Sequence, residues 1–172
     1  MADYKSHTED GKCIFCEIAN GHLHTPGIFW EDEEFMAFLS TYPNTEGFSV
    51  VIPKEHYESD VLSIPDEKLQ KFILAAKKVS KILTMYFKDV GRVGLIVEGT
   101  SINHAHFKLS PMHGTSFLKN GGWIQHHSNN DTYFETYKGY LCSNDGPKAN
   151  ENEITRLAGE LKRFLKTQLR GK

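Results

Sequence analysis

The sequence predicts an α+β domain built on an antiparallel sheet. Short apolar segments fall into two groups, and one long amphipathic segment follows each group, so the predicted order is strands, helix, strands, helix. This segregation favours an α+β fold over a parallel sheet in which strands and helices alternate one by one. The 172 residues, of which 39% are apolar and 24% charged, suffice for one soluble domain with a substantial core.

Charge and hydropathy argue against several kinds of partner. The net charge is −2 and no long run of Lys or Arg occurs, so we expect no surface for a nucleic-acid polymer. The longest apolar runs are far too short to cross a bilayer, and the N-terminus lacks the apolar region of a secretory signal. Three cysteines do not suggest a disulfide framework. We therefore expect a cytoplasmic protein without a membrane partner.

The first group of apolar segments predicts three strands, at residues 28–30, 35–39 and 48–52. The second of these segments is apolar at every position, which indicates a strand that is buried on both faces. A turn at residues 42–47 separates the second strand from the third. The polar residues 1–12 before this group are expected to form a mobile terminus.

A long helix is predicted to begin near residue 66. Ser63 and Asp66 fit the capping pattern S-x-x-D, and Pro65 suits the first helical turn. Apolar residues then recur at spacings of three and four over about five turns, which predicts one buried stripe. The stripe comprises Leu69, Phe72, Ile73, Ala76, Val79, Leu83, Tyr86 and Phe87.

Two further strands are predicted, one at residues 93–97 and one that contains residues 103–111. After them, the composition of the chain changes. Turn signals and scattered aromatic residues predict an extended arm over residues 114–150, longer than structural loops usually are. Such a segment is either a functional arm or packs across a partner. A last amphipathic helix is predicted from near Asn150. We therefore divide the chain into a mobile N-terminus at 1–12, a domain at 13–113, and a C-terminal arm with a terminal helix at 114–172.

The most distinctive stretch is Asn103–Pro111. Because side chains alternate along a strand, His104, His106 and Lys108 should share one face, opposite three apolar residues. The small polar loop at residues 99–101 precedes this row and offers backbone N–H groups to an anion. The simpler interpretation is a strand with a hydrated cationic face.

Cys13 and Cys16 form a C-x-x-C pair. The pair fits two free thiols, a redox pair or half of a zinc site, although the βαβ context of a redox motif is missing. Zinc requires two further ligands. The candidates are His56, His104, His22 and His24, and sequence spacing alone does not choose among them.

Taken together, these motifs resemble the histidine-triad (HIT) superfamily of nucleotide hydrolases and transferases. The resemblance rests on segments 13–18, 37–47 and 51–56 and on the H-x-H strand that ends at Pro111. It implies a HIT-like fold, in which a twisted antiparallel sheet carries one long helix, and assembly as a homodimer.

The resemblance also assigns roles. His106 matches the nucleophile of the triad, and Ser101 matches a serine that binds the phosphate or the leaving group. In the zinc-bearing branch, the structural metal is held by residues that match Cys13, Cys16, His56 and His104. The nucleoside pocket of relatives matches Ile14, Phe15, Ile18, Phe38, Leu39, Ser40 and Thr41, although plain core packing explains the apolar members equally well.

Two departures from the family pattern matter. Lys108 replaces the third histidine, and Ser40 replaces an acidic residue that holds the ribose hydroxyls. The implied function is a hydrolase or nucleotidyl transferase that acts at the α-phosphate of a nucleotide derivative through a covalent nucleotidyl group on His106. Gly99, Thr100 and Lys108 would contact the phosphate. The alternative is a nucleotide-binding or interaction module that keeps the zinc and catalyses little, which the loss of the third histidine favours.

Overall fold

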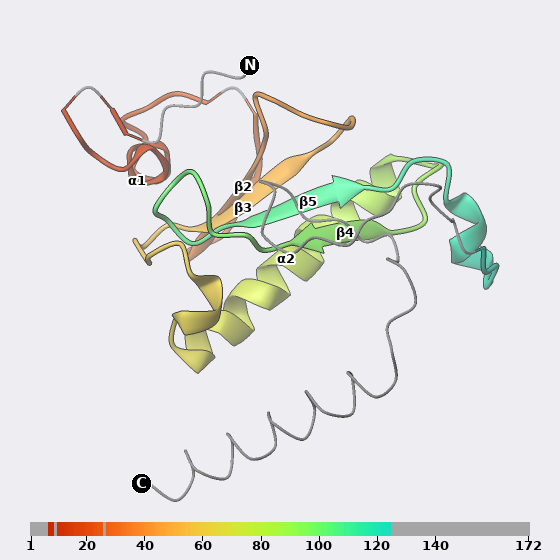
Figure 1. Cartoon of the computed structure of the whole chain (residues 1–172). Helices are drawn as coiled ribbons and strands as arrows, with labels where there is room; N and C mark the ends of the chain where they lie inside the picture. Colours follow the sequence, from red (N-terminus) through yellow and green to blue (C-terminus); the bar gives the residue numbers. More distant parts are fainter. Residues whose placement is uncertain (1–6, 9, 26, 125–172) are drawn as a thin grey trace, which may run out of the picture. The chain divides into compact units, whose positions relative to one another are not determined.

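The computed structural model describes residues 7, 8, 10–25 and 27–124 (Figure 1). The predicted terminal helix and most of the predicted arm lie outside these residues. Within the predicted N-terminal segment, an isolated β-bridge joins His7 to Cys13. No helix in the described part of the chain is long and apolar enough to span a membrane.

Five antiparallel strands form one sheet in the order β1-β2-β3-β5-β4, which confirms the predicted α+β class (Figure 1). The chain reaches β4 after the long helix and then returns, so that β5 lies between β3 and β4. The strands are β1 (Ile28–Glu31), β2 (Phe35–Leu39), β3 (Ser49–Pro53), β4 (Val93–Ile96) and β5 (Phe107–Pro111).

The prediction that the second strand is buried on both faces is confirmed. Phe35 and Ala37 of β2 belong to the core under the long helix. Met36 and Phe38 belong to a second cluster on the opposite face of the sheet. The sheet is therefore covered on both sides, and the smaller cover is α1 (Ile14–Ala19).

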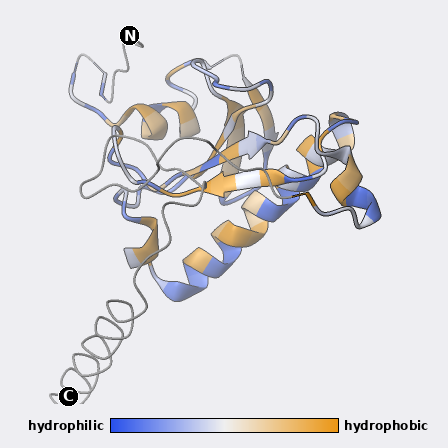
Figure 2. Cartoon of the chain, turned by 45° about the vertical axis from the view of Figure 1, so that its right-hand side comes forward, coloured by the Kyte–Doolittle hydropathy of each residue, from blue (hydrophilic) through white to orange (hydrophobic). Residues whose placement is uncertain are grey.

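Helix α2 (Asp66–Tyr86) covers the first face. The Phe72 ring stacks between Phe35 and Phe107, at centroid distances of 5.4 and 4.1 Å. Figure 2 shows apolar and hydrophilic residues alternating along α2, as expected for an amphipathic helix. The predicted stripe is wrong at Ile73 and Tyr86, which are 44% and 75% exposed.

The predicted start of this helix near residue 66 is confirmed, whereas the predicted cap by Ser63 is wrong. Pro65 occupies the N-cap position, and its carbonyl accepts a hydrogen bond from the Leu69 amide. Ser63 instead ends the short 3₁₀-helix η1 (Val61–Ser63), where its hydroxyl hydrogen-bonds to Asp60. The S-x-x-D pattern failed here because the Ser63 hydroxyl donates to Asp60 and Pro65, not Ser63, occupies the N-cap position.

Candidate functional site

The two histidines lie just before β5, which begins at Phe107 and not at residue 103 as predicted. The Ala105 amide donates to the Tyr57 carbonyl, which holds this segment against the residues after β3. The predicted alternation is confirmed, because Ala105 and Phe107 belong to the core under α2. His104 and His106 are 0% and 4% exposed, so the interpretation as a hydrated cationic face is wrong.

Cys13, Cys16, His56 and His104 meet at one point, with all four candidate ligand atoms within 4.8 Å of one another. The Cys16 Sγ atom lies 3.2 Å from His56 Nδ1 and 3.4 Å from His104 Nδ1. Four ligands of a tetrahedral zinc ion lie roughly 3.3–3.8 Å apart, given bonds of about 2.0–2.3 Å. The donor set therefore fits zinc, and the alternatives His22 and His24 are not part of this cluster.

Protonation supports this assignment. The His104 Nε2 atom lies 2.9 Å from the Pro53 carbonyl, which can only accept, so Nε2 carries the proton and the Nδ1 lone pair faces the thiols. Burial lowers the pKa of His104 to about 4, which keeps this ring neutral. In the metal-free protein, burial and the neighbouring Cys13 raise the pKa of the Cys16 thiol to about 11. A bound cation would favour the thiolate instead.

His106 is oriented by the same kind of contact. Its Nδ1 atom lies 2.7 Å from the His104 carbonyl, so Nδ1 donates a proton and Nε2 keeps its lone pair. Burial lowers the pKa of His106, which favours the neutral ring. The Phe15 ring contacts both histidines edge to face, at centroid distances of 5.8 and 5.6 Å. His106 is therefore held as a neutral ring that donates from Nδ1 and has a lone pair on Nε2.

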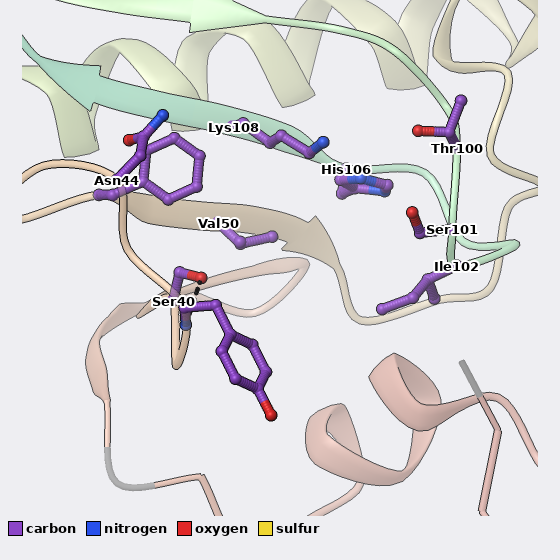
Figure 3. A pocket seen from close by; sticks show the side chains of 10 residues that line it. Ser40, Asn44, Val50, Thr100, Ser101, Ile102, His106 and Lys108 are labelled. Atoms are coloured by element: carbon purple, nitrogen blue, oxygen red, sulfur yellow. Dashed lines mark hydrogen bonds between the residues drawn. The ribbon is translucent and has the colours of Figure 1, made fainter. Parts of the chain in front are cut away.

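His106 lines a pocket of about 300 Å³ together with Ser101 and Lys108 (Figure 3). The pocket lies on the α1 face of the sheet. Its lining residue Val50 belongs to the same apolar cluster as α1, and Lys108 pairs with Val50 across β3 and β5 and therefore shares that face. The remaining residues that line it are Ser40, Tyr42, Asn44, Phe48, Thr100 and Ile102.

Some predicted substrate-binding residues line this pocket and others do not. Ser40, Thr100 and Lys108 line it, with the predicted catalytic residues Ser101 and His106. Phe15, Ile18 and Phe38 are buried in the cluster beneath, and Ile14 packs against that cluster. Leu39, Thr41 and Gly99 are not among the lining residues.

Gly99 lies on a neighbouring hollow beside Ser59. Its φ is +67°, and a Cβ there would lie 2.8 Å from the Ser59 carbonyl oxygen, so this position requires glycine. Ser101 also has a positive φ, of 75°, which is unusual for a residue with a side chain. The loop thus holds Ser101 in a strained conformation at the pocket wall.

Lys108 is not an isolated cation. Its ammonium forms an ion pair with Glu98, and the two side chains are 26% and 10% exposed. Local sequence does not predict the role of Glu98, because this residue follows β4 and only the sheet order brings it beside β5. Tyr42 and Asn44 lie in the predicted turn at residues 42–47, and no local signal marks them as pocket residues.

The family profile of the HIT domain matches residues 23–113, which is more than half of the chain. The chain belongs to the HIT domain family. An uncharacterized HIT-like protein of Methanocaldococcus jannaschii is 37% identical over 103 residues, covering 58% of this chain and 78% of that protein. The HIT family protein of Bacillus subtilis of known structure is 30% identical, with a TM-score of 0.52, over 66% of this chain and 82% of that one.

Two further comparisons extend this result. An adenosine 5′-monophosphoramidase of Saccharomyces cerevisiae is 27% identical over 139 residues, covering 81% of this chain and 87% of the yeast protein. A crystal structure from Streptococcus mutans aligns with a TM-score of 0.62 over 93% of this chain and 88% of that one. At 22% identity, the latter shows the fold alone.

Proposed function

We propose that this HIT protein is a nucleotide-binding hydrolase or nucleotidyl transferase that acts at the α-phosphate through a covalent nucleotidyl group on His106. The observation that carries the proposal is the hydrogen bond from His106 Nδ1 to the His104 carbonyl. It leaves Nε2 unprotonated in a ring that lines the pocket. The name of the yeast relative supports an adenosine 5′-phosphoramidate as one substrate.

The chemistry has two steps. His106 Nε2 attacks the α-phosphorus, a nitrogen–phosphorus bond forms, and the bond to the leaving group breaks with its electron pair; the leaving group takes a proton from solvent, and the Ser101 hydroxyl can donate a hydrogen bond to it. The modified ring is then cationic, and its Nδ1–H remains hydrogen-bonded to the His104 carbonyl, which stabilises that charge. Water next attacks phosphorus and loses a proton to solvent, the nitrogen–phosphorus bond breaks with its electron pair returning to Nε2, and the nucleoside monophosphate leaves a neutral ring. With another acceptor in place of water, the same intermediate gives a nucleotidyl transferase.

Lys108 and Thr100 would stabilise the phosphoryl oxygens from the wall of the pocket. Because Lys108 is already paired with Glu98, its ammonium reaches the phosphate as part of an ion pair and not as an isolated charge. Lysine also cannot accept a proton near neutral pH as the replaced histidine would. We therefore propose slower turnover than the full triad would give.

We further propose that Cys13, Cys16, His56 and His104 hold a structural zinc ion. Four protein donors would complete the shell that structural zinc prefers, so the metal would have no open position for substrate. Its contribution is to tie α1 and the segment after β3 to the segment that carries His106. The predicted homodimer stays a prediction, and light scattering at micromolar concentration would test it.

The alternative is a binding module, and turnover distinguishes the two. We expect the full chain to release AMP from adenosine 5′-phosphoramidate, and His106→Ala to lose turnover by several orders of magnitude while it still binds AMP. His24→Ala, a change at an exposed histidine, should behave as the wild type. If His106→Ala hydrolyses as fast as the wild type, the catalytic role is wrong. If no variant hydrolyses a nucleotide but all bind one, the binding module is the better description.

A further inference from the structure

The loop between β2 and β3 forms one wall of the pocket, to which it contributes Tyr42 and Asn44 (Figure 3). The far end of this loop is held by His113, which follows β5. The His113 Nε2 atom lies 3.1 Å from the Glu46 carbonyl oxygen, and its Nδ1 atom lies 3.0 Å from the carboxylate of Asp89. One side chain therefore connects the pocket loop to the residues that follow α2.

The partners of this ring decide its protonation. A carbonyl oxygen and an ionised carboxylate can only accept hydrogen bonds, whereas a neutral imidazole carries one N–H. Both hydrogen bonds of His113 can therefore exist together only when both ring nitrogens are protonated. The charged groups that face the ring are the Asp89 carboxylate, from the α2 side, and Glu46, from the loop.

The ion pair lies at the surface, where the side chains of His113 and Asp89 are 28% and 53% exposed, and two neighbouring groups contact it. The same oxygen of Asp89 also accepts from the Gly114 amide at 3.0 Å. The Phe87 ring packs edge to face on His113, with a centroid distance of 4.9 Å. Phe87 also lies so close to Gly47 that a Cβ at Gly47 would be 2.4 Å from the ring. The end of the loop is thus packed as well as hydrogen-bonded.

We propose that His113 is a positioning residue for the pocket, which as an imidazolium holds the β2–β3 loop in the geometry that receives a nucleotide and on deprotonation loosens it. The inference rests on the proposed function insofar as the ligand is a nucleotide. The hydrogen bond to the Glu46 carbonyl and the Asp89 carboxylate raise the pKa of His113. The double contact is therefore complete below the ordinary histidine pKa and is lost as pH rises through the raised value.

The test uses the full-length, zinc-loaded chain and three variants. Asp89→Asn keeps the shape but removes the charge that favours the imidazolium, His113→Gln removes the titrating group, and His24→Gln is a control at an exposed histidine. NMR follows the His113 ring and the backbone amides of Tyr42 and Asn44 between pH 6 and 9. Calorimetry measures the dissociation constant of AMP over the same range.

We expect the wild-type His113 ring to titrate above the usual value of about 6.5, the loop amides to shift with the same midpoint, and Asp89→Asn to lower both midpoints. At pH 6, His113→Gln should bind AMP about fivefold more weakly than wild type, because the loss of one hydrogen bond from this side chain has roughly that effect. That difference should vanish by pH 9. The control should follow the wild type throughout.

A ring that titrates at or below the usual value, or loop amides that do not follow it, would overturn the proposal. So would an AMP affinity that depends on pH identically in wild type and His113→Gln. The spectroscopic measurement needs no ligand. If neither the wild type nor any variant binds AMP, the assignment of the pocket to a nucleotide is wrong. The NMR signals of the loop amides would still decide the role of His113.

Discussion

Replacement of Cys16 by serine should remove the metal and, with it, a measurable part of the stability. A serine hydroxyl does not ionise near neutral pH, so Cys16→Ser deprives the four-ligand cluster of an anionic donor. Zinc bound to the native state adds about 4 kcal/mol when its free concentration is a thousandfold above the dissociation constant. For a chain of this length, that corresponds to roughly 8–16 °C in the melting temperature, at about 2–4 °C per kcal/mol.

Metal analysis of freshly purified protein and calorimetric melting would measure both effects. We expect about one zinc per wild-type chain, none in Cys16→Ser, and equal melting temperatures for Cys16→Ser and for wild type treated with a chelator. His22→Ala provides the matched control, because this exposed histidine lies near the cysteines in sequence but outside the cluster. Full zinc content in Cys16→Ser, or a wild-type melting temperature that a chelator leaves unchanged, would show that the four-ligand cluster holds no stabilising metal.

Three other perturbations follow from single contacts. Lys108→Ala should weaken AMP binding about tenfold, because a charge-assisted hydrogen bond is lost and the Glu98 carboxylate remains near the phosphate. Gly91→Ala should lower the free energy of unfolding by about 1–3 kcal/mol, because the new Cβ would lie 2.0 Å from the Thr115 carbonyl oxygen. Hydrogen bonds from two lysines of α2 lower the pKa of Glu34, so Glu34→Gln should lose stability at pH 7 and match wild type once pH falls below that lowered value.

Matched changes control these predictions. Gly94→Ala places its Cβ no closer than 3.7 Å to its neighbours, so it should cost less than Gly91→Ala in chemical denaturation. Glu67→Gln alters a carboxylate that is 87% exposed, so it should cost less stability at pH 7 than Glu34→Gln. Equal costs for the two glycine changes, or a Glu34→Gln effect on stability that does not diminish as the pH falls, would contradict the packing and the ion-pair accounts. AMP affinity unchanged in Lys108→Ala would exclude the lysine from the phosphate site.

Local patterns predicted much of the fold because burial acts on neighbouring residues. The apolar segment 35–39 and the alternation around Phe107 specify which faces are covered, and both predictions are confirmed. Ser63 shows the limit of such patterns, because its hydroxyl donates a hydrogen bond to Asp60 and does not cap the helix.

Local sequence patterns do not predict contacts between segments that are far apart in the chain. Cys16 and His56 are 40 residues apart, and their 3.2 Å contact depends on how β3 is placed under α1. The family resemblance supplied that pairing, whereas spacing left His22 and His24 open. Glu98 was missed because nothing in its local sequence indicates that β4 lies beside Lys108.

Intact-mass spectrometry of the chain, after rapid mixing with a nucleotide that carries a good leaving group, would show whether His106 forms a covalent nucleotidyl intermediate. We predict a species heavier by one nucleotidyl group, which peptide mapping places on His106 and which is absent in His106→Ala. Turnover without any such species in the wild type, or an adduct that persists in His106→Ala, would contradict the account.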